Sequence, residues 1–488
     1  MELNTIDLIV IGVFFILMLL IGVWSYFRNK SAEDYFVAGG KLPWWLSGIS
    51  HHVSGYSGAV FVAYAGLAYT HGFSVYIWWA LTIGINVMLS AKIFPVFWVR
   101  LRKRFRIQSP LEFLITRYNL PTQQLMAWSG VTLKLFDIGA KWAAIAILLN
   151  VFTGVSLSVG IWISGGISLI YITFGGLWAV IITDLAQFIV QILAGMVMFV
   201  VVLQRLGGFD AIFTMWDQLP EGNSQAFNDP YTVGFALVFL FINFLSYNGG
   251  QWNLATRYIS SPSEQQASKA AWLSGALYLV WPLILFFPMW AAPIILPNME
   301  DPTQSYGILT MELLPVGLIG LVIASLFANT MSMTSSDINT ISAVITRDIL
   351  PALSKKFRDK NTSLVMARVT TFLFTLGTII IALQFERFGG VLGLIISWFG
   401  ALVGPIAVPM LFGLIPWFKS CGPKAAIGSI IVGLAAFVFT KNYELNNLGL
   451  EVGLPVISST ITYILVGFIQ RDYVPEKVKK MLEDIAQE

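Results

Sequence analysis

Apolar residues in this chain are gathered into blocks of about twenty, separated by short stretches rich in charged residues, proline or glycine. An α-helix of about twenty residues spans the hydrocarbon core of a bilayer, so each block has the length of a membrane-spanning helix. Hydrophobic residues make up 57% of the 488 residues and charged residues 11%, which is more apolar surface than a soluble core could bury. The chain is therefore expected to be an all-α polytopic membrane protein.

Cutting the sequence at the charged and Pro/Gly-rich stretches predicts thirteen membrane-spanning helices. They cover residues 6–27, 45–70, 75–99, 124–152, 156–173, 178–204, 232–255, 270–296, 314–346, 364–385, 388–418, 425–440 and 453–470. The opening MELNTID lacks the basic region of a signal peptide, so the first span is expected to be a retained helix. A single cysteine, Cys421, excludes an internal disulfide and a thiolate metal cluster.

The basic residues orient these spans in the membrane. With the amino-terminus outside and the carboxyl-terminus inside, 23 of the 29 Lys and Arg residues fall on the cytoplasmic side. Topology explains basic clusters such as RLRKRFR (100–106), so no nucleic-acid partner is expected, nor an obligate protein partner. We expect a multi-pass protein of the cell membrane, in contact with lipid, with a bacterial inner membrane favoured. No phosphate-binding loop is present, so uphill transport would draw on an ion gradient rather than ATP.

Two spans contain glycines and polar residues near mid-depth. The second reads LSGISHHVSGYSGAVFVA (46–63) and the seventh FLSYNGGQWNLA (244–255). Each glycine disfavours the helix by about 1 kcal/mol. Interrupted helices five spans apart predict an inverted repeat, whose unwound segments form solute and ion sites in secondary transporters. Glycines used only for close helix packing are the alternative.

The segment TMSMTSSDINT (330–340) places many oxygen-bearing side chains inside an apolar span. Ser332, Ser336 and Asn339 are spaced to share one helical face. Sodium is a hard cation that prefers oxygen ligands, and the intramembrane carboxylate of Asp184 is the expected partner at a similar depth. Asp337, next to Ser336, is not assigned to this group of sodium ligands. It could serve in structural pairing or in proton or ion coupling.

Four separated motifs occur in order along the chain. They read AEDYFVAGGKLPWW (32–45), YITFGGLWAVIITDLAQ (171–187), LPVGLIGLVIASLFA (314–328) followed by the polar segment, and GPIAVPMLFGLIPW…GPKAAIGSIIVG (404–433). From about residue 30 to 435 the chain resembles the solute:sodium symporter family, which includes sodium/glucose, sodium/proline and sodium/sialic acid transporters. The resemblance implies a leucine-transporter-like five-plus-five inverted repeat. The expected domains are an extra helix (1–30), two repeats (31–206 and 207–418) and a carboxyl-terminal part (419–488).

The resemblance also implies two sodium sites. A second site found in some members maps onto Asp184, Ser335 and Ser336, with Ser332 nearby. The site common to the family maps onto the backbone carbonyls of Val53, Tyr56 and Asn329 and onto two adjacent hydroxyls, the first of which is Ser332. Met333 occupies the position of the second hydroxyl, and a thioether is a poor sodium ligand. Sodium is the expected coupling ion, and no other cofactor is expected.

The substrate site is less well determined. Lys134, Asp137 and Lys141 are spaced to share one face of the fourth span, either as an internal network or with one lysine facing an anionic solute. The family places substrate residues in this region and beside both interrupted helices. The candidates are Ser57, Val60, Trp79, Thr82, Lys141, Tyr247, Asn248, Gln251, Asn253 and Tyr278.

These features predict a sodium-coupled symporter for a small polar solute, with a sugar or a sialic-acid-like sugar acid favoured, and not an enzyme. The alternatives are a symporter for an amino acid or another carboxylate, and a sodium-independent facilitator of the same fold, which Met333 would favour.

Overall fold

The structure is a computed structural model that describes residues 3–354, 357, 364–385, 404–443, 445, 447–470 and 473–487. Its described part is built from helices, with a single isolated antiparallel bridge between Asn228 and Tyr231. The predicted all-α polytopic class is confirmed. Part of the predicted span 388–418 lies outside the described residues.

The long helices are α1 (Thr5–Tyr26), α8 (Leu120–Thr153), α9 (Leu157–Arg205), α13 (Glu264–Ile295), α15 (Leu318–Val344), α17 (Leu364–Ala382), α19 (Pro423–Asn442) and α20 (Leu448–Gln470). The shorter ones are α2 (Ala32–Val37), α3 (Trp44–Val53), α4 (Ala63–His71), α5 (Thr82–Leu89), α6 (Phe94–Phe105), α7 (Leu114–Arg117), α10 (Ala211–Thr214), α11 (Val233–Leu245), α12 (Trp252–Ile259), α14 (Ser305–Leu313), α16 (Leu350–Leu353) and α21 (Glu476–Ala486).

Within the described residues, eight helices are long and apolar enough to cross a membrane, or nine if the pair from Tyr76 to Phe105, bent by 54°, counts as one span. The number is lower than thirteen partly because predicted spans five and six form the single element α9. That element bends at Gly176, whose φ of 53° lies in the left-handed region that glycine adopts most readily. The interrupted second span is divided into the short helices α3 and α4, whereas the first part of the interrupted seventh span, Val233–Gly250, is among the eight.

Both predicted helix interruptions are present. The first helix stops at Val53 and resumes with α4 at Ala63, after a short 3₁₀ turn. The second stops at Leu245, passes through a π-helical turn (Ser246–Gly250) and resumes as α12. Gly249, within that turn, adopts a φ of 127°. The α12 helix continues to Ile259, four residues beyond the predicted end of this span at 255.

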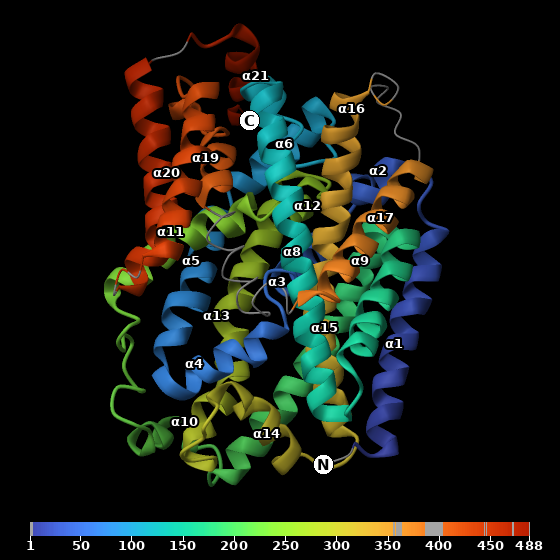
Figure 1. Cartoon of the computed structure of the whole chain (residues 1–488), viewed down its shortest axis with the longest axis vertical. Coiled ribbons are helices and arrows are strands. Elements are labelled where there is room, and N and C mark those ends of the chain that lie inside the picture. Colours follow the sequence, from blue (N-terminus) through green and yellow to red (C-terminus); the bar gives the residue numbers. More distant parts are fainter. Residues whose placement is uncertain are drawn as a thin grey trace.

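The halves α3 and α12 of the broken helices lie near the centre of the molecule, with α1 on one flank and α19 and α20 on the other (Figure 1). The two chain termini lie at opposite ends, and α21 packs beside α6 (Figure 1), where Arg104 pairs with Asp484 at 2.9 Å.

The helix that carries the polar segment, α15, is held at its first turn by α1. The Oδ1 atom of the buried Asp7 accepts hydrogen bonds from the backbone N–H groups of Gly317 and Gly320, both at 2.7 Å. The first N–H groups of a helix have no partner within the helix, and the carboxylate supplies one. The amino-terminal helix therefore caps α15.

Candidate ion and solute sites

The carboxylate of Asp184 is completely buried in α9 and is surrounded by hydroxyl groups. Its Oδ1 atom accepts a hydrogen bond from Ser332 at 2.6 Å, and its Oδ2 atom accepts one from Ser54 at 3.1 Å and one from Ser50. These serines come from α15 and from the first interrupted helix. The structure thus brings Asp184 and Ser332 together as predicted, and adds two serines that the sequence did not single out.

Ser336 lies one helical turn beyond Ser332 on α15 and joins the same group, 2.8 Å from the hydroxyl of Ser54. Ser335 is also fully buried, but its hydroxyl donates to the backbone carbonyl of Ser332 at 3.1 Å, on another face of the helix. Within the described residues, the hydrogen-bond partners of Asp184 are Ser50, Ser54, Ser332 and Arg257, and Ser335 is not one of them. Its inclusion in the sodium site stays a prediction.

A fully buried arginine completes the group. The NH2 atom of Arg257 on α12 donates to Asp184 Oδ2 at 3.2 Å, to Ser54 at 3.0 Å and to Ser336. Its Nε atom donates to Ser50 at 2.8 Å. We call this set, Asp184, Arg257 and serines 50, 54, 332 and 336, the Asp184 cluster. It joins both interrupted helices to α9 and α15.

The predicted seventh span stops at residue 255, which places Arg257 in a cytoplasmic loop. Ser50 and Ser54 are predicted to belong to the broken second span but not to an ion site. One signal was available: Ser50 and Ser54 are four residues apart and so share a helical face.

The residues predicted for the family's common sodium site lie beside the break of the first interrupted helix. Val53 ends α3, and Tyr56 follows in the non-helical stretch before the 3₁₀ turn. On α15, the hydroxyl of Thr330 accepts a hydrogen bond from Gly58 N at 3.2 Å. The Asn329 amide donates to the Ser325 carbonyl at 2.8 Å, and its Oδ1 atom is buried with no hydrogen-bond partner among the described residues. The three carbonyl assignments remain predictions.

A second buried cluster consists of Lys134, Asp137, Lys141 and Asp337, which we call the lysine cluster. Lys134 lies 2.8 Å from Asp337 and 3.4 Å from Asp137, and Lys141 lies 2.6 Å from Asp137 and 3.4 Å from Asp337. Two lysines and two aspartates make the cluster electrically neutral. Lys141 is predicted either to belong to an internal network or to face an anionic solute. In this geometry it belongs to the internal network. Asp337 belongs to that network.

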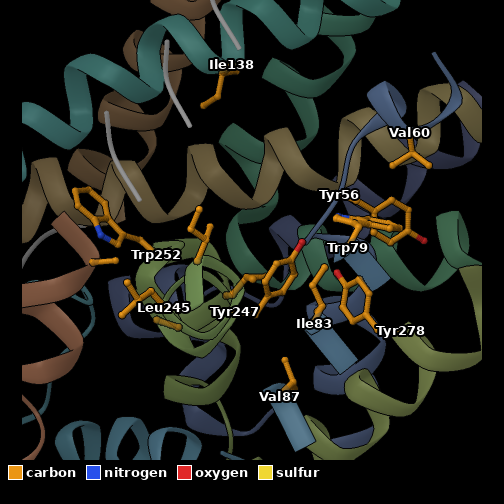
Figure 2. Close-up of a cluster of buried hydrophobic side chains, with 14 of the residues drawn as sticks. Tyr56, Val60, Trp79, Ile83, Val87, Ile138, Leu245, Tyr247, Trp252 and Tyr278 are labelled. Carbon is orange, nitrogen blue, oxygen red and sulfur yellow. The ribbon is translucent and has the colours of Figure 1, made fainter. Parts of the chain in front are cut away.

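Aromatic candidates for solute binding gather around the first helix interruption (Figure 2). The hydroxyls of Tyr247 and Tyr278 donate to the carbonyls of Gly55 and His52, each at 2.8 Å. The Trp79 ring meets Tyr278 edge-on, with ring centroids 6.2 Å apart. The unwound carbonyls are thus satisfied by tyrosines, which form an aromatic wall.

The remaining candidates are not aromatic. Val60 is buried in the 3₁₀ turn, and Ser57 lies in the non-helical stretch before it. The Thr82 hydroxyl accepts from the amide of Asn243 at 2.7 Å. The Asn248 side chain accepts from Ser90 at 2.5 Å.

Two amides on the second interrupted helix have unused hydrogen-bonding capacity. Asn253 donates through Nδ2 to the Ser54 carbonyl at 3.1 Å, while its Oδ1 atom and the Oε1 atom of Gln251 are buried without hydrogen-bond partners in the part of the chain that the structure describes. Buried polar atoms are normally paired, so these two oxygens are free to accept a donor from another molecule or from a moved side chain.

The pattern of two broken helices enclosing buried ionic and aromatic groups can be compared with known proteins. The sodium:solute symporter family matches residues 35–433. The chain belongs to the sodium:solute symporter family. The family predicted from the sequence motifs is therefore confirmed. The symporter is a multi-pass membrane transporter and not an enzyme.

Relatives cover almost the whole symporter. It is 25% identical to the sodium/sialic acid symporter of Aliivibrio fischeri over 92% of this chain and 89% of that protein. It is 27% identical to the sodium/sialic acid symporter of Proteus mirabilis over 87% of each chain. It is also 25% identical to the sodium/glucose cotransporter of Vibrio parahaemolyticus, over 90% of this chain and 86% of that one.

Solved structures share the fold. A sodium-coupled sialic acid symporter in a substrate-bound, outward-open state superposes with a TM-score of 0.83 at 22% identity, covering 96% of this chain and 98% of that one. A nucleobase-cation-symport-1 family transporter in a closed conformation gives a TM-score of 0.59 at 15% identity, covering 94% and 99%.

Proposed function

We propose that this symporter couples the inward movement of sodium to the import of a sugar or sugar acid, with a sialic-acid-like solute favoured. The observation that supports it most directly is the Asp184 cluster, in which one buried carboxylate and four serine hydroxyls supply the oxygen ligands that sodium prefers. The relatives named for sialic acid and for glucose support the solute class.

For the arrangement in the membrane, we propose thirteen spans with the amino-terminus outside and the carboxyl-terminus inside, in a bacterial inner membrane. The two termini lie at opposite ends of the molecule, which an odd number of spans requires. Residues 31–206 and 207–418 form the two inverted repeats, each of which begins with an interrupted helix. Solute and sodium then meet between these helices, as in transporters built from such repeats.

In the proposed cycle, sodium binds Asp184, Ser54, Ser332 and Ser336, with Ser335 contributing by a small rotation of α15. The solute lies against Tyr247, Tyr278 and Trp79. Aromatic rings suit the apolar faces of sugar rings, and the free amide oxygens of Gln251 and Asn253 can accept hydrogen bonds from sugar hydroxyls.

A carboxylate on the solute would have to engage the lysine cluster by exchange. Because Lys141 already pairs with Asp137 and Asp337, an anion can bind it only if one aspartate releases it. A neutral sugar needs no such exchange, and it is therefore the second candidate solute. An amino acid, another carboxylate solute, or a sodium-independent facilitator are further alternatives, the last favoured by Arg257 beside Asp184.

Uptake into proteoliposomes tests the proposal. An inward sodium gradient should stimulate accumulation of labelled sialic acid or glucose, compared with a potassium gradient of the same ionic strength. A thermal-shift screen in sodium, comparing hexoses, sugar acids and amino acids, identifies the solute class. Equal uptake with and without sodium would contradict coupling, and stabilisation by amino acids alone would contradict the solute class.

A further inference from the structure

Arg257 occupies the position in which the proposed function places the sodium ion. The NH2 atom of its guanidinium contacts a carboxylate oxygen of Asp184 and the hydroxyls of Ser54 and Ser336. A sodium ion bound by these oxygens would lie in the space that the NH2 atom fills. The guanidinium and a sodium ion therefore cannot both occupy it, and like charges so close together repel each other.

Arg257 has a second possible hydrogen-bond acceptor on its own helix. Asn253 precedes Arg257 by one turn on α12, so the two side chains share a helical face. The NH1 atom of Arg257 already donates to the Asn253 backbone carbonyl at 3.3 Å, and the buried Oδ1 atom of Asn253 has no hydrogen-bond partner among the described residues. A guanidinium that leaves Asp184 has this oxygen as an alternative acceptor one helical turn away, and its Nε atom can keep the bond to Ser50.

We infer that Arg257 is a tethered counter-ion, which neutralises Asp184 in the empty carrier and moves toward Asn253 when sodium binds. This inference rests on the proposed function and adds a role for the step that symport requires after release: the empty carrier must return to the outward-facing state without sodium. An unpaired buried carboxylate opposes that return, because a charge without a partner is costly in a medium of low polarity. Arg257 supplies the partner in the sodium-free state.

The test separates two modes of transport in proteoliposomes. Net uptake needs return of the empty carrier, whereas exchange of labelled for unlabelled solute, with saturating sodium on both sides, does not. For Arg257→Gln we expect net uptake to fall about tenfold or more relative to exchange. In a thermal-shift titration of the purified variant, the half-saturating sodium concentration should also fall about tenfold, because sodium no longer displaces a cation.

Two further variants control the test. Arg257→Lys retains a tethered cation and should restore part of the net uptake, and it serves as the probe if Arg257→Gln does not fold. Arg117→Gln removes another buried arginine, which donates hydrogen bonds to the carbonyls of Gly413 and Phe418, outside both clusters. Its ratio of net uptake to exchange should equal that of the unaltered protein.

An equal loss of exchange and net uptake in Arg257→Gln, together with weaker sodium binding, would show that Arg257 is a fixed part of the site and would overturn the inference alone. Exchange and uptake by the unaltered protein that do not depend on sodium would overturn the proposed function, and the inference with it.

Discussion

Two buried ionic clusters share α15 but differ in what surrounds their charges. In the lysine cluster, each of four charged groups contacts charges of opposite sign at 2.6 to 3.4 Å. In the Asp184 cluster, one carboxylate and one guanidinium are in contact at 3.2 Å, and the hydroxyls of Ser50 and Ser54 contact both of them. Ser332 adds a hydroxyl on the carboxylate and Ser336 one on the guanidinium. In the first arrangement an additional ion would have to displace a charged side chain, whereas the second offers hydroxyl oxygens that a different cation could use.

The two clusters have different roles along α15. The lysine cluster ties α8 to α15 by mutually dependent charges, so the loss of one member leaves another unpaired. The Asp184 cluster is tolerant of exchange, because Arg257 contacts hydroxyls and a backbone carbonyl as well as Asp184. Four substitutions examine this difference.

The largest effect is expected for Asp337→Asn. Lys134 and Lys141 would then share the single carboxylate of Asp137, and breaking a buried ion pair typically costs about 3–5 kcal/mol of stability. The double variant Asp337→Asn/Lys134→Met should recover most of this loss, since it restores charge balance. Thermal unfolding of the purified proteins measures both. A single variant as stable as the unaltered protein would show that the lysine cluster is not a structural tie.

Lys141→Ala examines whether the lysine cluster also binds solute. If an anionic solute exchanges with an aspartate at Lys141, solute binding should weaken by about 2 kcal/mol, while sodium binding stays nearly intact. Lys134→Ala is the matched control, because it removes the other lysine from the same two aspartates. Calorimetric titration with a sugar acid measures the affinities. Equal losses in the two variants would assign both lysines to structure and favour a neutral solute.

Asp184→Asn should lower sodium affinity about tenfold or more, equivalent to about 1.4 kcal/mol for each factor of ten. Arg257 would keep its bonds to the serines and to the Asn253 carbonyl but lose its ion pair with Asp184, so this variant is also expected to lose stability. Sodium-dependent uptake and thermal unfolding provide the two measurements. Unchanged stimulation of uptake by sodium would place the coupling site elsewhere.

Met333→Ser should have the smallest effect. Met333 is buried beside Ser332, and a hydroxyl there would restore the pair that the family's common sodium site uses. We expect a second sodium dependence, seen as a higher Hill coefficient for sodium-stimulated uptake. A folded variant with an unchanged coefficient would mean that the coordination of this site does not involve position 333.

Much of this arrangement could be predicted from the sequence. Apolar blocks indicate most helices, and glycines among polar residues indicate both interruptions. The spacing of Ser332 and Ser336 places them on one helical face, the face that meets Asp184. These features depend on local periodicity, which can be recognised in the sequence without knowledge of the fold.

The charge partners could not be predicted, because they depend on how interrupted helices pack. Arg257 lies two residues beyond a predicted helix end, which was enough to place it in a loop. Asp337 lies about 100° around α15 from Ser336, and only the position of α8 shows that it meets the lysines.

The cap that Asp7 provides has a mechanical consequence. Because the first turn of α15 is fastened to α1, tilting of α15 would pivot about that end. Ser332 lies fifteen residues further along, about 22 Å at 1.5 Å per residue, so a tilt of about 10° would carry its hydroxyl by about 4 Å. A sodium–oxygen contact tolerates only a small fraction of that displacement. A small angular change at the fastened end is thereby magnified into the making or breaking of ion coordination.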